Sequence, residues 1–169
     1  MWNDTDIPLA YLITFRCYGT WLHGDERGSI DRFHNRYESP FLPRSDRRKD
    51  LSERQLKSPP VTLNASQRES VDSAIREVCD HRKWFLHALN VRTNHVHTVV
   101  SIGKLKPERA LNALKHMRHD GCEEMVTGNR NTRPGADRGS KKRLWNERSI
   151  ALAIDYVKNG QGGDLPPFD

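Results

Sequence analysis

Residues 84–102 read WFLHALNVRTNHVHTVVSI and contain two runs of residues typical of β-strands. Residues 84–91 and 95–102 are rich in β-branched and aromatic side chains, and a short polar segment separates them. We therefore predict two strands that pair as a β-hairpin. A further strand is predicted over residues 10–18 (AYLITFRCY), because apolar and polar residues alternate there.

Three segments with helical periodicity accompany these strands. They cover residues 65–82, residues 107 to about 126, and residues 150–159, and a short edge strand is predicted at residues 143–146. This order of elements predicts an α+β fold, a ferredoxin-like antiparallel sheet with helices packed on one face. The other face of the sheet would be open for a ligand.

The chain of 169 residues is predicted to form a single domain, residues 1–169. Residues 19–60 contain scattered glycines and prolines, so we expect a long irregular insertion there, and residues 163–169 should form a loose tail. No apolar stretch approaches the roughly 20 residues of a membrane span. The first residues also lack the basic region of a signal peptide, so we expect a cytoplasmic protein with no membrane association.

Basic residues outnumber acidic ones, 28 against 22, which gives a formal net charge of +6. Their densest run is NRNTRPGADRGSKKR, residues 129–143. Such a patch is typical of nucleic-acid binding, although a solvated surface loop explains a charge run equally well. The candidates for contacts with DNA phosphates are Lys115, Arg118, Arg130, Arg133, Arg138, Lys141, Lys142 and Arg143.

Two histidines form the most informative motif of the chain. His95 and His97 are two residues apart in a predicted strand, so they project from the same face, while Val96 packs into the core on the other side. Two imidazoles at this spacing can bind one metal ion. The alternative is two half-exposed histidines on a solvated strand face. A complete metal site needs a further ligand from elsewhere in the chain.

Tyr156 is the one tyrosine that follows the histidine pair. On the last predicted helix, the spacing of Ile150, Ala153, Ile154 and Val157 forms a buried stripe, and Tyr156 falls at its edge. From this position its side chain can reach a cleft beside the sheet. The alternative is a boundary tyrosine that covers the core.

The strand NHVHTVV, preceded by a helix and a hairpin partner and followed by a helix with one tyrosine, resembles the HUH single-tyrosine transposases. Within them it is similar to the REP-associated tyrosine transposases and their insertion-sequence relatives. The segments AYLITFRCYGTWLHGDERGS (residues 10–29) and RLWNERSIALAIDYVKNGQG (residues 143–162) also look like parts of this group.

The resemblance implies a ferredoxin-type fold, a Mg²⁺ or Mn²⁺ ion, and cleavage of single-stranded DNA flanked by hairpin or palindromic recognition elements. Tyr156 would attack the scissile phosphate, form a 5′-phosphotyrosine and release a 3′-hydroxyl. A second 3′-hydroxyl could then reverse the reaction at a new junction, which is strand transfer. The resemblance is compatible with a monomer or a homodimer.

The third metal ligand is where this chain departs from the family pattern. The family commonly places Gln or Asn one turn after the tyrosine, but Gly160 occupies that position here. Asn159 and Gln161 are therefore the candidates that would complete the site of His95 and His97. Because of this departure, a non-catalytic single-stranded nucleic-acid-binding module on the same fold stays open as an alternative. A further alternative is a histidine–metal hydrolase that cleaves phosphodiesters with activated water.

Overall fold

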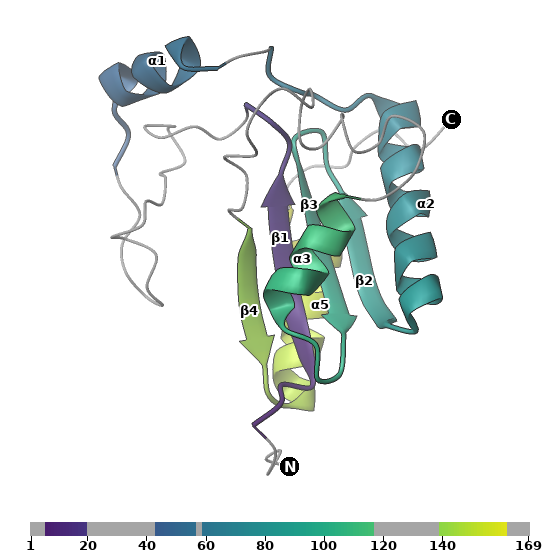
Figure 1. Cartoon of the computed structure of the whole chain (residues 1–169). Coiled ribbons are helices and arrows are strands. Elements are labelled where there is room, and N and C mark those ends of the chain that lie inside the picture. The colour runs from purple at the N-terminus through teal and green to yellow at the C-terminus, as the bar shows by residue number, and fades with distance from the viewer. Residues whose placement is uncertain (1–5, 20–42, 57–58, 117–138, 162–169) are drawn as a thin grey trace.

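Four strands form one antiparallel sheet in the computed structural model, which describes residues 6–19, 43–56, 59–116 and 139–161. The strand order is β2-β3-β1-β4 (Figure 1). The bounds are Ala10–Arg16 for β1, Phe85–Val91 for β2, His95–Ser101 for β3 and Ser140–Leu144 for β4. The predicted hairpin is present as β2 and β3, and β4 begins three residues earlier than the sequence predicts.

The described helices are α1 (Asp46–Arg54), α2 (Ala65–Arg82), α3 (Pro107–Lys115) and α5 (Glu147–Asn159). The bounds of α2 match the prediction, because the Asn64 side chain accepts a hydrogen bond from the backbone of Gln67 and fixes the first turn. α5 begins earlier than predicted. Its cap is Asn146, and Ser149 supplies the reciprocal bond of the capping box.

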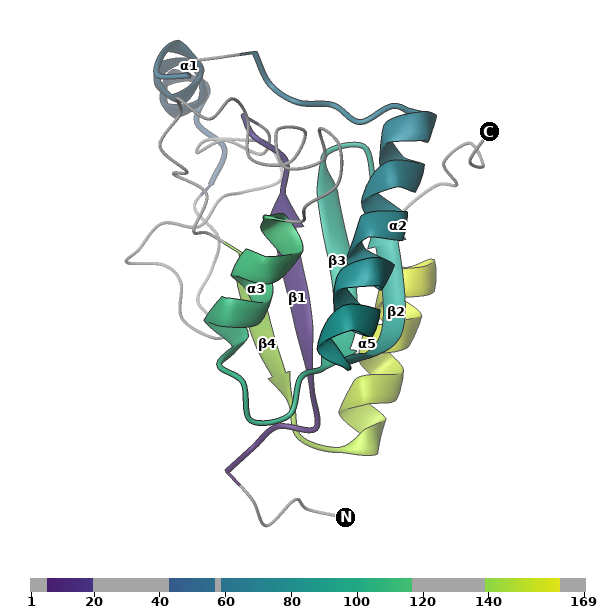
Figure 2. The ribbon, with the colours of Figure 1, turned by 45° about the vertical axis from the view of Figure 1, so that its right-hand side comes forward.

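The two faces of the sheet carry separate apolar clusters. On one face, β1 contributes Tyr11, Ile13 and Phe15 to a core that α2 and α3 cover. On the other face, α5 covers the sheet (Figure 2). Ala153 and Val157 of α5 belong to the second apolar cluster there. Both sides of β1 and β3 therefore bury apolar residues, as the period of two in a strand allows.

The α+β fold with an antiparallel sheet is confirmed, but one detail of the predicted arrangement differs. α2 and α3 share a face as expected. α5 lies on the other face of the sheet, which was predicted to be open for a ligand. The reason is that half of that face is apolar, through Leu12, Ala88 and Val99, and needs a cover. The other half carries the polar side chains described below.

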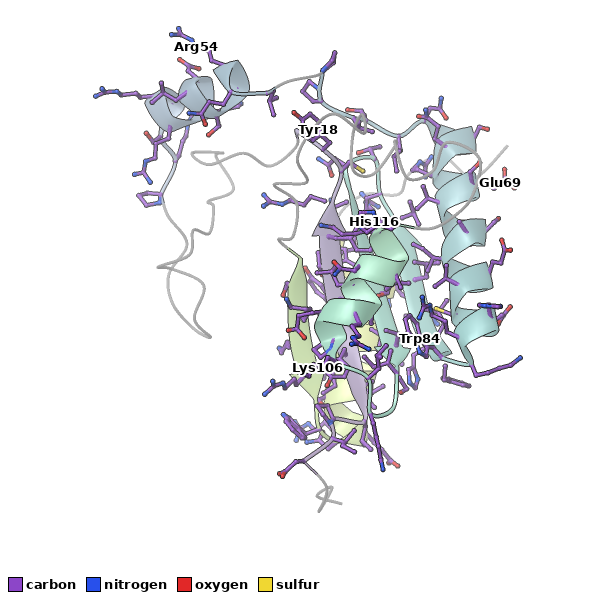
Figure 3. The ribbon with its side chains drawn as sticks, viewed as in Figure 1. Tyr18, Arg54, Glu69, Trp84, Lys106 and His116 are labelled. Atoms are coloured by element: carbon purple, nitrogen blue, oxygen red, sulfur yellow. The ribbon has the colours of Figure 1, made fainter. Side chains whose placement is uncertain are left out.

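Part of the predicted irregular insertion is helical. α1 lies within residues 19–60, buries none of its side chains, and holds Arg54 apart from the sheet (Figure 3). The remainder of that insertion at residues 20–42 and 57–58, the predicted end of the second helix at residues 117–126, and the predicted tail at residues 163–169 lie outside the described residues. No helix among those described combines the length and the apolar character needed to cross a bilayer.

Candidate active site

A polar row crosses the sheet on the face that α5 covers. Asn90 of β2 lies opposite His97 of β3, His97 lies opposite Thr14 of β1, and Thr14 lies opposite Ser140 of β4. The sheet register thus aligns one polar residue from each strand. This row divides the face into two halves. The apolar half lies under the body of α5, and the other half lies at the C-terminal end of α5.

His95 and His97 project from the same face, as their spacing predicts, and their ring centroids are 4.7 Å apart at an angle of 83°. Val96 between them is fully buried in the core on the other side. The Nδ1 atom of His97 lies 2.7 Å from the Thr14 hydroxyl, and the Nδ1 atom of His95 lies 2.6 Å from the Asn94 side-chain oxygen. Each ring is therefore oriented by a hydrogen bond at Nδ1, which directs Nε2 away from that partner.

His97 is only 4% exposed, and its surroundings keep it neutral. Burial is the largest cause that lowers the pKa of His97 to about 4, and electrostatic interactions with His95 and Arg92 act in the same direction. A hydrogen bond with the Gln161 side chain opposes them. At neutral pH the ring thus keeps a nitrogen lone pair, which is the form that binds a metal ion.

Tyr156 lies beside this pair. Its ring centroid is 5.5 Å from that of His97, the two rings meet edge to face at 80°, and the side chain is 45% exposed. The helix α5 presents it there because Ala153 and Val157 are buried against the sheet. Tyr156 is therefore at the edge of the buried stripe, as the helical spacing predicts.

The two candidates for a third ligand have different surroundings. The Gln161 side chain hydrogen-bonds His97, and its Nε2 donates to the Tyr156 carbonyl at 3.0 Å. The Asn159 side chain instead donates to the Asp155 carboxylate at 2.8 Å on the exposed side of α5. The end of α5 thus brings Gln161, and not Asn159, to the histidines.

Sequence reasoning missed two residues of this site. Thr14 contacts His97 from 83 residues away, and the Asn90 Nδ2 donates to the Val157 carbonyl at 2.8 Å. The alternation in β1 and β2 places both on the α5 face, but only the register between the strands shows that they flank His97. That register depends on the fold and has no local signal.

The predicted phosphate contacts divide into three groups. Lys115 is only 3% exposed, so the structure does not present it on the surface where a phosphate contact is expected. Lys141, Lys142 and Arg143 lie on the edge strand β4, where Lys141 pairs with Glu108 at 3.7 Å. Arg118, Arg130, Arg133 and Arg138 lie outside the described residues.

A family model described as "Transposase IS200 like" matches residues 57–151, which is more than half of the chain. The chain belongs to this transposase family. The match includes both histidines and ends five residues before Tyr156. It confirms the resemblance to single-tyrosine transposases and supports a role in DNA transposition and recombination. No match to a curated protein accompanies it.

Proposed function

We propose that this transposase-family chain cleaves and rejoins single-stranded DNA through a covalent bond between Tyr156 and a DNA 5′-phosphate. The observation that carries the proposal is the position of the Tyr156 ring, 5.5 Å from the neutral His97 and on the same side of the sheet as His95. A nucleophile and two potential metal ligands thus share one partly exposed site at the end of α5. The family match gives this site its substrate class, which is DNA.

The donor set fits a divalent cation. No group of three or more His, Cys, Asp or Glu side chains that could hold a metal occurs among residues 6–19, 43–56, 59–116 and 139–161. The amide of Gln161 lies beside His97 and is the candidate for a third ligand. We assign the ligands as His95, His97 and Gln161, whose Nε2 is engaged by the Tyr156 carbonyl and whose oxygen is the donor that a hard cation prefers. A bound Mg²⁺ or Mn²⁺ would polarise the scissile phosphate and stabilise the negative charge that develops on it.

The cleavage step uses the Tyr156 hydroxyl as the nucleophile. Its oxygen forms a bond to the phosphorus, the phenolic proton passes to solvent water, and the bond between the phosphorus and the 3′ oxygen breaks. The departing 3′ oxygen takes up a proton, which yields a 3′-hydroxyl and a 5′-phosphotyrosine. Attack of another 3′-hydroxyl on the phosphotyrosine reverses these bond changes and joins a new DNA end without a high-energy cofactor.

The surroundings of the site favour an anionic strand. Arg16 lies opposite His95 in the sheet register, and the positive charge of Arg92 reaches His97. Both residues lie beyond the polar row, on the side away from the apolar half of the α5 face. Cationic side chains at this position would contact phosphates and so position the strand, without reading its bases.

The decisive experiment is a covalent-adduct assay. Wild-type protein is incubated with Mn²⁺ and an end-labelled single strand that carries a hairpin, and the products are separated on a denaturing gel. We expect a protein–DNA band that Tyr156→Phe abolishes. Tyr11→Phe is the matched control, because Tyr11 is buried on the opposite face of the sheet and its hydroxyl is remote from this chemistry.

The other outcomes separate the alternative functions. One such outcome is nicking of the DNA with no covalent adduct. If this nicking is retained in Tyr156→Phe but lost in His97→Ala, the protein is a hydrolase that uses activated water. Salt-sensitive binding with no cleavage in Mg²⁺ or Mn²⁺ would indicate a non-catalytic binding module. Either result would overturn the assignment of Tyr156 as the nucleophile.

A further inference from the structure

Asn90 links the sheet to the helix that carries Tyr156. It lies in β2 directly opposite His97, and its side-chain Nδ2 donates to the backbone carbonyl of Val157 at 2.8 Å. Val157 is the residue that follows Tyr156. One side chain therefore ties the strand position beside His97 to the helix position beside Tyr156, across 67 residues of sequence.

The last turn of a helix leaves carbonyl groups without intrahelical donors. At the end of α5, the Tyr156 carbonyl accepts from the Gly160 N–H at 2.9 Å and from the Gln161 side chain at 3.0 Å. The Val157 carbonyl accepts from Asn90. Two amide side chains of the site, Gln161 and Asn90, thus satisfy neighbouring carbonyls of this turn.

The apolar contacts of α5 alone do not fix the rotation and the position of its last turn on the sheet. Ala153 and Val157 hold the helix against the sheet, but hydrophobic contact is non-directional and permits small rotations and shifts of the helix. A hydrogen bond is directional, so the bond from Asn90 restricts both movements at the turn that carries Tyr156. Val157 is bonded to Tyr156 and lies in the same turn of α5, so a shift of the Val157 carbonyl is transmitted through that turn to the backbone of Tyr156.

We propose that Asn90 is a positioning residue that sets the Tyr156 hydroxyl for attack by holding the Val157 carbonyl. This inference rests on the proposed function of Tyr156. It predicts that loss of the Asn90 donor slows formation of the phosphotyrosine while the binding of DNA, which depends on other side chains, is retained. A misplacement of the nucleophile of about 1 Å is enough to slow a reaction by about 100-fold.

The test is Asn90→Asp, which keeps the shape of the side chain but replaces the amide donor with an acceptor. Asn112→Asp is the matched control, because Asn112 is exposed on α3 at the opposite face of the sheet. Two quantities are measured for each protein: the rate constant for adduct formation at saturating DNA, and the Kd for the same strand. We expect Asn90→Asp to lower the rate at least 10-fold and to change Kd less than 3-fold, with Asn112→Asp unchanged in both.

The opposite results would overturn the inference. An Asn90→Asp protein whose rate stays within 2-fold of wild type, or whose only change is a weaker Kd, would show that Asn90 does not position Tyr156. If circular dichroism shows that Asn90→Asp is not folded, Asn90→Ala, which removes the donor without adding a charge, is judged by the same two quantities.

Hydrogen exchange separates a failure of this inference from a failure of the proposed function. If wild-type protein forms no adduct, Tyr156 is not the nucleophile, but the role of Asn90 at the end of α5 can still be measured. We then expect Asn90→Asp to accelerate exchange in peptides from residues 155–161 and not in those from α2. Unchanged exchange at residues 155–161 would overturn the positioning role itself.

Discussion

The two faces of the sheet use the same strands for different purposes. On the face that α2 and α3 cover, β1 contributes Tyr11, Ile13 and Phe15 to an apolar core. On the α5 face, the same strand contributes Thr14 to the polar row that includes His97. Because side chains alternate along a strand, the first face can supply stability while the second holds a chemical site on a rigid support. Substitutions at neighbouring positions of β1 should therefore have separable effects.

The largest effect is expected for Phe15→Ala. Phe15 is 1% exposed within the core of the α2–α3 face, and removal of a buried aromatic ring costs about 3 to 5 kcal/mol of stability. Urea unfolding followed by circular dichroism would measure this loss. Tyr156→Phe on the α5 face is the contrast and should change the unfolding free energy by less than about 0.5 kcal/mol. Equal losses in the two variants would contradict the division between the faces.

A smaller effect, on rate rather than on folding, is expected for Thr14→Val. The substitution keeps the shape of the side chain but removes the hydroxyl that lies 2.7 Å from the His97 Nδ1. Loss of such an orienting partner typically lowers metal affinity or activity about 10- to 100-fold. The assay is Mn²⁺-dependent adduct formation, with metal binding measured separately by calorimetry.

Thr98→Val provides the control for Thr14→Val. Thr98 lies in β3, next to His97 in sequence but on the other side of the strand, and its hydroxyl donates a hydrogen bond of 3.4 Å to the Ile13 carbonyl. The same chemical change there should leave both Mn²⁺ affinity and adduct rate within about 2-fold. A rate loss as large as that of Thr14→Val would mean that the faces are not functionally separate.

A pH effect on stability should also come from the α5 face. The pKa of His97 is lowered from 6.5 to about 4 in the folded chain, so the unfolded chain binds more protons between these values. Stability is therefore lost as the pH falls through this window, by about 2 kcal/mol at pH 5 relative to pH 8. Urea unfolding in the presence of a chelator would measure it.

The matched variant for this pH effect is His97→Gln, which cannot titrate. Its unfolding free energy should vary less between pH 8 and pH 5, by the amount that wild type loses through His97. The His87→Gln variant should keep most of the wild-type pH dependence, because the pKa of His87 is lowered by a lesser burial. Identical curves for wild type and His97→Gln would show that the buried imidazole is not the source.

Some features of the two faces could be predicted from the sequence, and others could not. The hairpin, α2 and the shared face of His95 and His97 follow from local periodicity, and all three are present. The position of α5 does not follow from it, because Ala10 and Leu12 make β1 apolar on both sides and either face could take a helix.

The site residues that the sequence did not predict also depend on contacts between distant segments. Thr14 and Asn90 reach His97 and Val157 through strand register and helix docking, across 83 and 67 residues. The choice between Asn159 and Gln161 depends on how the chain turns at Gly160, where α5 ends. Contacts that join distant segments have no local sequence signal, so they become visible only once the register is known.

The smallest effect, on DNA binding, is expected for the edge strand β4. Its predicted phosphate contacts lie on different faces of the sheet. Lys142 lies opposite Leu12 and shares the α5 face, whereas Lys141 lies opposite Ile13 and pairs with Glu108 on the α3 side. If DNA lies along the α5 face, Lys142→Gln should weaken binding a few-fold and reduce the slope of log K against log salt by about 0.7, the value for one phosphate contact on a single strand. Lys141→Gln should leave this slope unchanged, because its ammonium is already paired on the opposite side. Equal changes in the two variants would mean that the strand crosses the sheet edge and does not follow one face.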